Sequence, residues 1–162
     1  MPKALQVHII SRRTFVVSAA FGLCLPSILA KAEAPSTSVM ERTSQFEEAF
    51  KAILAGATPT EGKILLDLPE IAENGNFVPV TITVDSPMTA EDHVKAIHLL
   101  STGNPVARVA TFHLTPINAV ARVQSRMRLA KTQDVIALAE LNNGTLAIAT
   151  TLVKVTIGGC SG

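Results

Sequence analysis

The spacing of apolar residues changes once along the chain. In residues 38–55, apolar positions recur every three or four residues, the spacing of an amphipathic helix. These positions are Val39, Phe46, Phe50, Ile53 and Leu54. Gly56 then supplies a helix stop. We therefore expect one helix over about 38–55, with the face that carries Met40, Phe46 and Phe50 packed on a core.

From residue 63 onward apolar and polar residues tend to alternate, which is the period of β-strands. The pattern predicts strands over residues 63–68, 77–84, 94–100, 106–113, 120–130, 134–141 and 145–157. Turn residues separate them, at Asn74-Gly75-Asn76, Asp85-Ser86-Pro87, Gly103-Asn104-Pro105 and Asn142-Asn143-Gly144. The last of these is a hairpin signal. Short antiparallel strands of this number predict a mainly β, immunoglobulin-like sandwich with one N-terminal helix.

The alternation is clearest between residues 120 and 129. The residues predicted to face the core are Ala121, Val123, Ser125, Met127 and Leu129, and those predicted to face solvent are Arg122, Gln124, Arg126 and Arg128. The arginine row formed by Arg122, Arg126 and Arg128 has two interpretations. It is a solvated or partner-facing strand surface, or it binds an anionic substrate.

Composition supports a β-rich core and argues against a nucleic-acid partner. Hydrophobic residues make up 48% of the 162 residues but aromatic residues only 4%, so the core must consist mainly of aliphatic side chains. After residue 34 the chain holds ten basic and twelve acidic groups, a net charge of −2. A weakly acidic domain without a basic stripe lacks the electrostatic footprint of a nucleic-acid-binding protein.

The N-terminal residues predict an export leader. Arg12 and Arg13 directly precede an apolar run over residues 15–30 that is broken by Pro26 and is short for a membrane span. The pattern resembles a twin-arginine leader, with cleavage after Ala30 or, as we expect, after Ala34. An ordinary secretory leader or a retained anchor is the alternative; a lipid anchor at Cys24 is disfavoured because Leu23 precedes it.

This leader gives a three-part organisation: a leader over residues 1–34, the sandwich with its helix over 35–157, and a tail over 158–162. It also predicts a periplasmic protein without a membrane anchor after cleavage. The twin-arginine route exports folded proteins, often with a bound cofactor or partner. The mature chain has no cofactor or metal motif, so we expect a protein partner that folds with it before export.

Cys160 is the one cysteine left after the leader is removed. An odd cysteine in an exported protein indicates either intermolecular pairing or a reactive thiol. Gly158, Gly159, Ser161 and Gly162 surround it, so we expect a flexible arm that starts after Ile157 and reaches roughly 10 Å over three residues.

A thiol on such an arm has three possible uses. A disulfide between two copies gains nothing from the glycines. A nucleophile in its own active site needs rigid positioning, which the tail does not supply. A covalent carrier needs a slim arm that enters other proteins, and the residues match this use.

The C-terminal tail and several internal segments resemble one known family. The segment from Val153 to the Gly158-Gly159-Cys160-Ser161-Gly162 tail resembles that of the SoxY family. Further similar segments are Val84-Asp85-Ser86-Pro87-Met88-Thr89, Val94-Lys95-Ala96-Ile97-His98 and Ala110-Thr111-Phe112-His113-Leu114-Thr115-Pro116. With the leader, the resemblance covers nearly the whole chain.

The resemblance implies a sulfur carrier of the periplasmic thiosulfate-oxidising Sox system rather than an enzyme. It implies that a c-type cytochrome enzyme conjugates thiosulfate to Cys160 and that a hydrolase then releases sulfate. A sulfane dehydrogenase oxidises the remaining sulfur in some systems. The implied structural partner is a SoxZ-like subunit. The alternative is a self-contained thiol enzyme, either a sulfurtransferase or a peroxidatic protein, which needs a base or cation beside Cys160.

Ser161 departs from the family ending, where a glycine is usual, so a paralogue with altered partners stays open. The carboxylate of Gly162 is expected to disfavour the Cys160 thiolate. His93, His98 and His113 match no common zinc spacing, and we expect structural or surface roles for them. Glu91 and Asp92 fall in a predicted turn and are assigned no catalytic role.

Overall fold

The computed structural model describes residues 42–159. They form one α-helix, α1 (Ser44–Leu54), a short 3-10 helix, η1 (Pro116–Asn118), and eight strands. The strands are β1 (Ile64–Asp67), β2 (Ile71–Asn74), β3 (Val78–Val84), β4 (Val94–Ser101), β5 (Arg108–His113), β6 (Ala121–Met127), β7 (Gln133–Leu141) and β8 (Leu146–Ile157).

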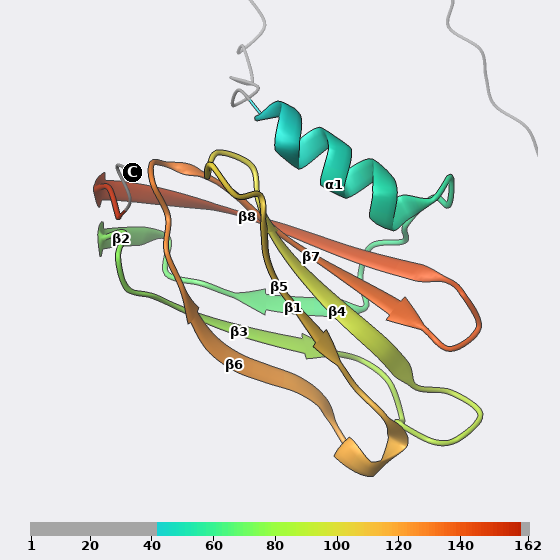
Figure 1. The fold of residues 1–162 in the computed structure, drawn as a ribbon. Coiled ribbons are helices and arrows are strands. Elements are labelled where there is room, and N and C mark those ends of the chain that lie inside the picture. The colour runs from blue at the N-terminus through green and yellow to red at the C-terminus, as the bar shows by residue number, and fades with distance from the viewer. Residues whose placement is uncertain (1–41, 160–162) are drawn as a thin grey trace, which may run out of the picture. The chain divides into compact units, whose positions relative to one another are not determined.

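The strands make two sheets, which pack as the layers of a sandwich (Figure 1). One has the order β1-β3-β6 and the other the order β2-β8-β7-β4-β5. The predicted immunoglobulin-like sandwich is confirmed. The hairpin between β7 and β8 turns at Asn142-Asn143-Gly144, where Gly144 has a φ of 82°, a left-handed conformation that glycine adopts readily.

All seven predicted strands are present, with ends that shift by a few residues. The eighth, β2, falls where only a turn was predicted. It pairs with β8 in parallel, through Ile71 with Lys154 and Asn74 with Ile157, so the expectation of purely antiparallel strands is wrong. The segment lies between Pro69 and Gly75 and is too short to show a period, so its pairing with β8 makes it a strand.

The helix begins later than predicted. Thr43 has extended backbone and its hydroxyl accepts a hydrogen bond from the Phe46 amide at 3.2 Å, which caps the first turn. Ala55 is left-handed (φ 47°) and ends the helix just before Gly56. Val39 and Met40 lie outside the described residues. No helix in the described part of the chain is both long enough and apolar enough to span a bilayer.

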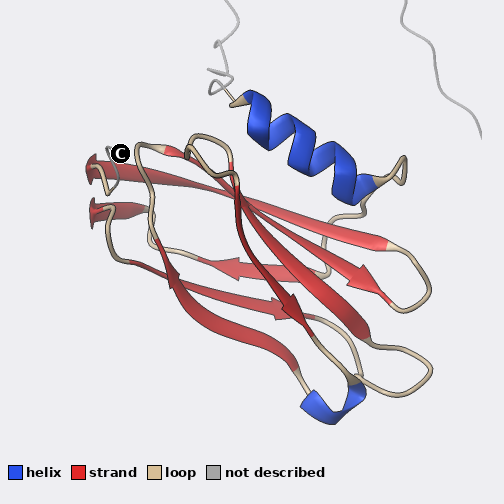
Figure 2. Cartoon of the chain, in the orientation of Figure 1, coloured by secondary structure: helices blue, strands red, loops and turns tan. Residues whose placement is uncertain are grey.

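Two apolar clusters stabilise the fold. The larger fills the space between the sheets with aliphatic side chains, as the composition predicts; among its members are Val80, Ile82, Ile97, Leu99, Val135 and Val153. The smaller joins α1 to the outer face of the five-stranded sheet, where Phe46 meets Leu100, Ile136 and Leu138. Figure 2 shows the helix along this sheet. Strand β7 therefore has a core on both faces, which explains its nearly continuous burial.

Candidate functional site at the end of strand β8

The residues predicted to carry the chemistry divide between two parts of the chain. Cys160, Ser161 and Gly162 lie outside the described residues, as do the leader residues Arg12 and Arg13. Gly158 and Gly159 are described, and they connect β8 to Cys160. The geometry of these two glycines therefore defines the base from which the thiol projects.

The end of β8 is held by β2 rather than by β7. The ladder between β7 and β8 ends at Gln133 with Val153. Beyond that point Lys154 donates its amide to the Glu70 carbonyl at 2.9 Å, and Val155 donates its amide to the Thr132 hydroxyl at 2.9 Å. The parallel strands β2 and β8 then finish side by side at the same end of the sandwich (Figure 1).

Three backbone hydrogen bonds continue this arrangement past Ile157. Gly75 donates its amide to the Ile157 carbonyl, Leu129 donates to the Gly75 carbonyl, and Gly159 donates to the Leu129 carbonyl, each at 2.8 Å. We call Gly75, Gly158 and Gly159, with the backbone of Leu129 and Ala130, the glycine junction. It ties the last described residues to two other segments of the chain.

The junction leaves no room for side chains. A Cβ on Gly159 would collide with the backbone of Gly75 and Asn76, and one on Gly158 with the Ala130 carbonyl oxygen. A Cβ on Gly75 would collide with the Leu129 carbonyl oxygen and would lie 2.8 Å from the Gly159 nitrogen. These obstacles are backbone atoms, which cannot rotate away as the end of a side chain can. Glycine is therefore required here for close approach.

The structure shows where the expected arm meets the folded body. The sequence predicted a flexible segment from Gly158 onward, with the glycines serving as joints. Gly159 is instead buried and hydrogen-bonded, and Gly158 rests against Ala130. Both glycines belong to the folded body, because their lack of a Cβ allows backbone to pack on backbone.

A partly buried polar network holds the segment of the junction that contains Leu129 and Ala130. The side chain of Asn104 donates to the Arg128 carbonyl at 2.8 Å and accepts from the Ala130 amide at 2.9 Å. Gln133, only 1% exposed, donates to the Asn104 side-chain oxygen at 2.8 Å and to the Lys131 carbonyl at 3.1 Å. The segment that receives Gly158 and Gly159 is thus fixed by side chains from β7 and from the loop after β4.

Comparison with known proteins identifies the family. The family model "Sulfur oxidation protein SoxY" matches residues 50–160. The sulfur carrier protein SoxY from Chlorobium limicola f thiosulfatophilum is a similar solved structure, with 35% identity and a TM-score of 0.57 over 70% of this chain and 98% of that one. The chain belongs to the SoxY family. No curated protein matches it at the significance required.

Other solved structures resemble this SoxY-family protein in fold alone. A superoxide reductase (neelaredoxin) from Ignicoccus hospitalis has a TM-score of 0.52 at 21% identity, covering 58% of this chain and 80% of that one. Identity this low shows a shared sandwich fold alone.

The three histidines do not gather into one site. The His93 ring bonds the Thr89 carbonyl at 3.0 Å in the loop before β4, and His98, half-buried on β4, bonds the Thr111 hydroxyl at 3.0 Å. Burial lowers the pKa of His98 from its ordinary value of 6.5, and the positive charge of Arg108 lowers it further. His113 is exposed at the end of β5. Among residues 42–159, no three His, Cys, Asp or Glu side chains are grouped as metal ligands would be.

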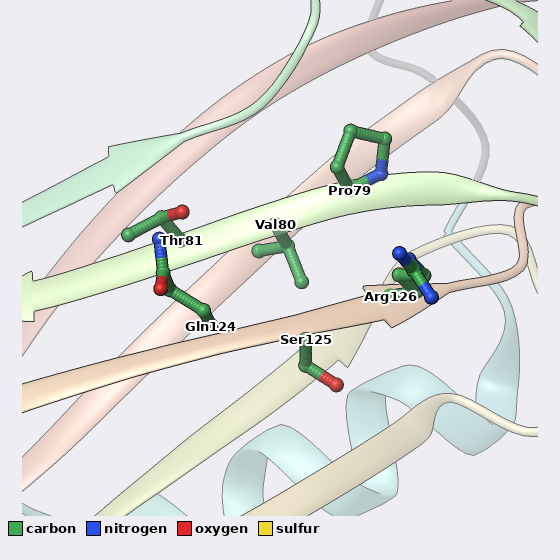
Figure 3. Close-up of a pocket in the computed structure, with 6 residues that line it drawn as sticks. All are labelled: Pro79, Val80, Thr81, Gln124, Ser125 and Arg126. Carbon is green, nitrogen blue, oxygen red and sulfur yellow. The ribbon is translucent and has the colours of Figure 1, made fainter.

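The arginine row is confirmed as solvent-facing, since Arg122, Arg126 and Arg128 are all exposed. Ser125, predicted on the opposite, core-facing side, is exposed as well, so that prediction is wrong for this one residue. The Arg126 guanidinium lies 4.4 Å from the centre of the Phe77 ring, a cation–π contact. A shallow hollow of about 560 Å³ is lined by residues of the paired strands β3 and β6, and Arg126 is the member of the row that lines it (Figure 3). The row therefore does not converge on one anion site.

Sequence reasoning missed Gly75 as part of the functional site. Asn74-Gly75-Asn76 has the composition of a turn, and the Asn74 side chain does accept the Asn76 amide at 2.9 Å. Nothing local in this tripeptide indicates that its glycine bonds Ile157 and packs against Gly159. The contact joins segments more than eighty residues apart and becomes visible only in the fold.

Proposed function

We propose that this protein carries sulfur covalently on Cys160 for the enzymes of a thiosulfate-oxidising Sox system. Membership of the SoxY family supports a sulfur-carrier role in that system. The extent of the family match supports Cys160 as the attachment site. The match covers residues 50–160, and Cys160 is the sole cysteine within this range. A covalent sulfur carrier needs a thiol, and this range offers one.

The chemistry of loading is an oxidation. The Cys160 thiolate and the terminal sulfur of thiosulfate form a sulfur–sulfur bond and give up two electrons, which a c-type cytochrome enzyme accepts. The product is a cysteine S-thiosulfonate. Hydrolysis of its bond between sulfur and the sulfonate then adds one water and releases sulfate and a proton, which leaves a persulfide on Cys160. Both steps are performed by partner enzymes, so the carrier itself needs no catalytic residues.

Intact-mass spectrometry tests the carrier role. The protein is incubated with thiosulfate and the cytochrome partner, and the mass is followed with time. We expect a stoichiometric thiosulfonate adduct that maps to Cys160 and is absent in Cys160→Ser. Loading of the Cys160→Ser variant would refute the attachment site. Catalytic turnover of thiosulfate by the isolated chain would indicate a thiol enzyme instead.

We further propose that the carrier works in the periplasm, together with a SoxZ-like subunit. The Arg12-Arg13 pair and the apolar run behind it support export by the twin-arginine route. Cell fractionation tests this: Arg12→Lys with Arg13→Lys is expected to leave the precursor in the cytoplasm, while the unchanged protein reaches the periplasm. Recovery of the unchanged protein from periplasmic extracts without any bound subunit would contradict the partner proposal.

A further inference from the structure

The glycine junction restricts how far the thiol can travel. Cys160 is the residue that follows Gly159 in the sequence, and one residue adds at most about 3.8 Å of chain. Gly159 is buried and held by its hydrogen bond to Leu129. While that bond is intact, Cys160 stays within one residue of a fixed atom. An arm that started at Ile157 would have three residues of freedom instead.

Gly75 is the central member of the junction. Its amide bonds the Ile157 carbonyl, its carbonyl accepts the Leu129 amide, and its Cα approaches Gly159 so closely that neither residue has room for a Cβ. Gly159 donates its hydrogen bond to Leu129, which Gly75 itself holds, and its close backbone neighbours are Gly75 and Asn76. A change at Gly75 therefore acts on Cys160 through Gly159, without touching the sulfur.

We propose that Gly75 is a positioning residue for the carrier thiol: by docking Gly158 and Gly159 on the body of the protein, it fixes the point from which Cys160 is presented. The biological meaning of this device rests on the proposed carrier function. An enzyme that draws the thiol further out must first break the hydrogen bond between Gly159 and Leu129. Glycines on both sides of this contact serve close packing rather than free rotation.

Amide hydrogen exchange of the unaltered full-length protein, measured by NMR, tests the docked state directly. The Gly159 amide donates a hydrogen bond from a buried position, so we expect it to exchange at least about tenfold more slowly than in an unstructured chain. Exchange of the Gly159 amide at the unstructured rate would overturn the proposal. This measurement needs no variant and does not depend on the folding of one.

Alkylation of Cys160 tests the role of Gly75. The full chain reacts with a bulky maleimide, and the peptide that contains Cys160 is quantified by mass spectrometry. The variant Gly75→Ala places a Cβ against the Leu129 carbonyl and 2.9 Å from a Val155 methyl group, so it must displace the tail. We expect alkylation of Cys160 to be faster by about fivefold, the shift produced by loss of one average hydrogen bond.

Gly144→Ala is the matched control. Gly144 has a φ of 82°, and no atom lies within 4 Å of the point that a Cβ would occupy, so alanine there strains the backbone in the hairpin between β7 and β8 without touching the junction. We expect its Cys160 to react at the rate of the unaltered protein. An equal rise in both variants, or no rise in Gly75→Ala, would refute the positioning role.

Neither measurement uses thiosulfate, so the positioning role of Gly75 can be refuted without refuting the carrier function, and the carrier function without the positioning role. A protected Gly159 amide together with a Cys160 that accepts no thiosulfate would leave the junction intact and remove the carrier function. Normal loading of Cys160 with an unprotected Gly159 amide would do the reverse.

Discussion

Replacing the buried Gln133 with methionine is expected to destabilise the sandwich strongly. Gln133 lies at the start of β7 and is 1% exposed. Its side-chain oxygen accepts the Gly103 amide at 2.7 Å, and its side-chain nitrogen donates to Asn104 at 2.8 Å and to the Lys131 carbonyl at 3.1 Å. Methionine has a similar length and flexibility but makes none of these bonds.

The magnitude follows from these three contacts. A hydrogen bond contributes about 0.5–1.5 kcal/mol net, and a buried polar group that loses its partner costs more. Gly103 is partly exposed, so its amide can donate to a water molecule once the Gln133 oxygen is removed. The lower half of the range therefore applies to this hydrogen bond. We expect the free energy of unfolding to fall by about 2–4 kcal/mol.

Urea unfolding followed by circular dichroism measures this change. Gln124→Met is the matched control, because Gln124 is exposed on β6 and the same substitution there should change the free energy of unfolding by no more than about 0.5 kcal/mol. If the two variants lost the same free energy, or if Gln133→Met lost less than about 1 kcal/mol, the network would not stabilise the fold as argued.

Two further changes test the packing and the electrostatics of the sheet. Phe46→Ala removes the fully buried side chain that joins α1 to β4 and β7, and we expect a loss of about 3–5 kcal/mol in urea unfolding; a loss below about 2 kcal/mol would mean that the helix is not packed on the sheet. The pKa of His98 is lowered in the folded state, mainly by burial and further by the charge of Arg108. Between this lowered pKa and pH 6.5, the His98 side chain is therefore protonated in the unfolded chain but neutral in the folded protein. Stability is therefore expected to be full above pH 6.5 and to fall as the pH decreases from 6.5 through the lowered pKa. His98→Asn should weaken this dependence, and parallel stability curves of the two proteins between about pH 7.5 and about pH 5 would contradict it.

The hydrophobic period predicted most of the fold because it is a local property. Alternation placed β3, β4 and β7 within a residue of their observed positions. It also predicted the solvent-facing row of Arg122 and Arg126 on β6 and Arg128 directly after it. The hairpin at Gly144 was predictable from turn chemistry alone. The start of the helix was less predictable. The apolar spacing predicted a helix from residue 38, but Thr43 has extended backbone and caps the helix, which begins at Ser44.

The sequence by itself determined the class of fold, the lone thiol of the matched range and the resemblance to the SoxY family, because each depends on residue types and their spacing. The tertiary structure decided β2, its parallel pairing with β8, and the contacts of the glycines before Cys160. A glycine has the same local signature whether it serves as a joint or as a place for close packing. The approach of Gly75 to Gly159, from a segment far away in the sequence, is visible only in the fold, where it places the glycines before Cys160 against the folded body.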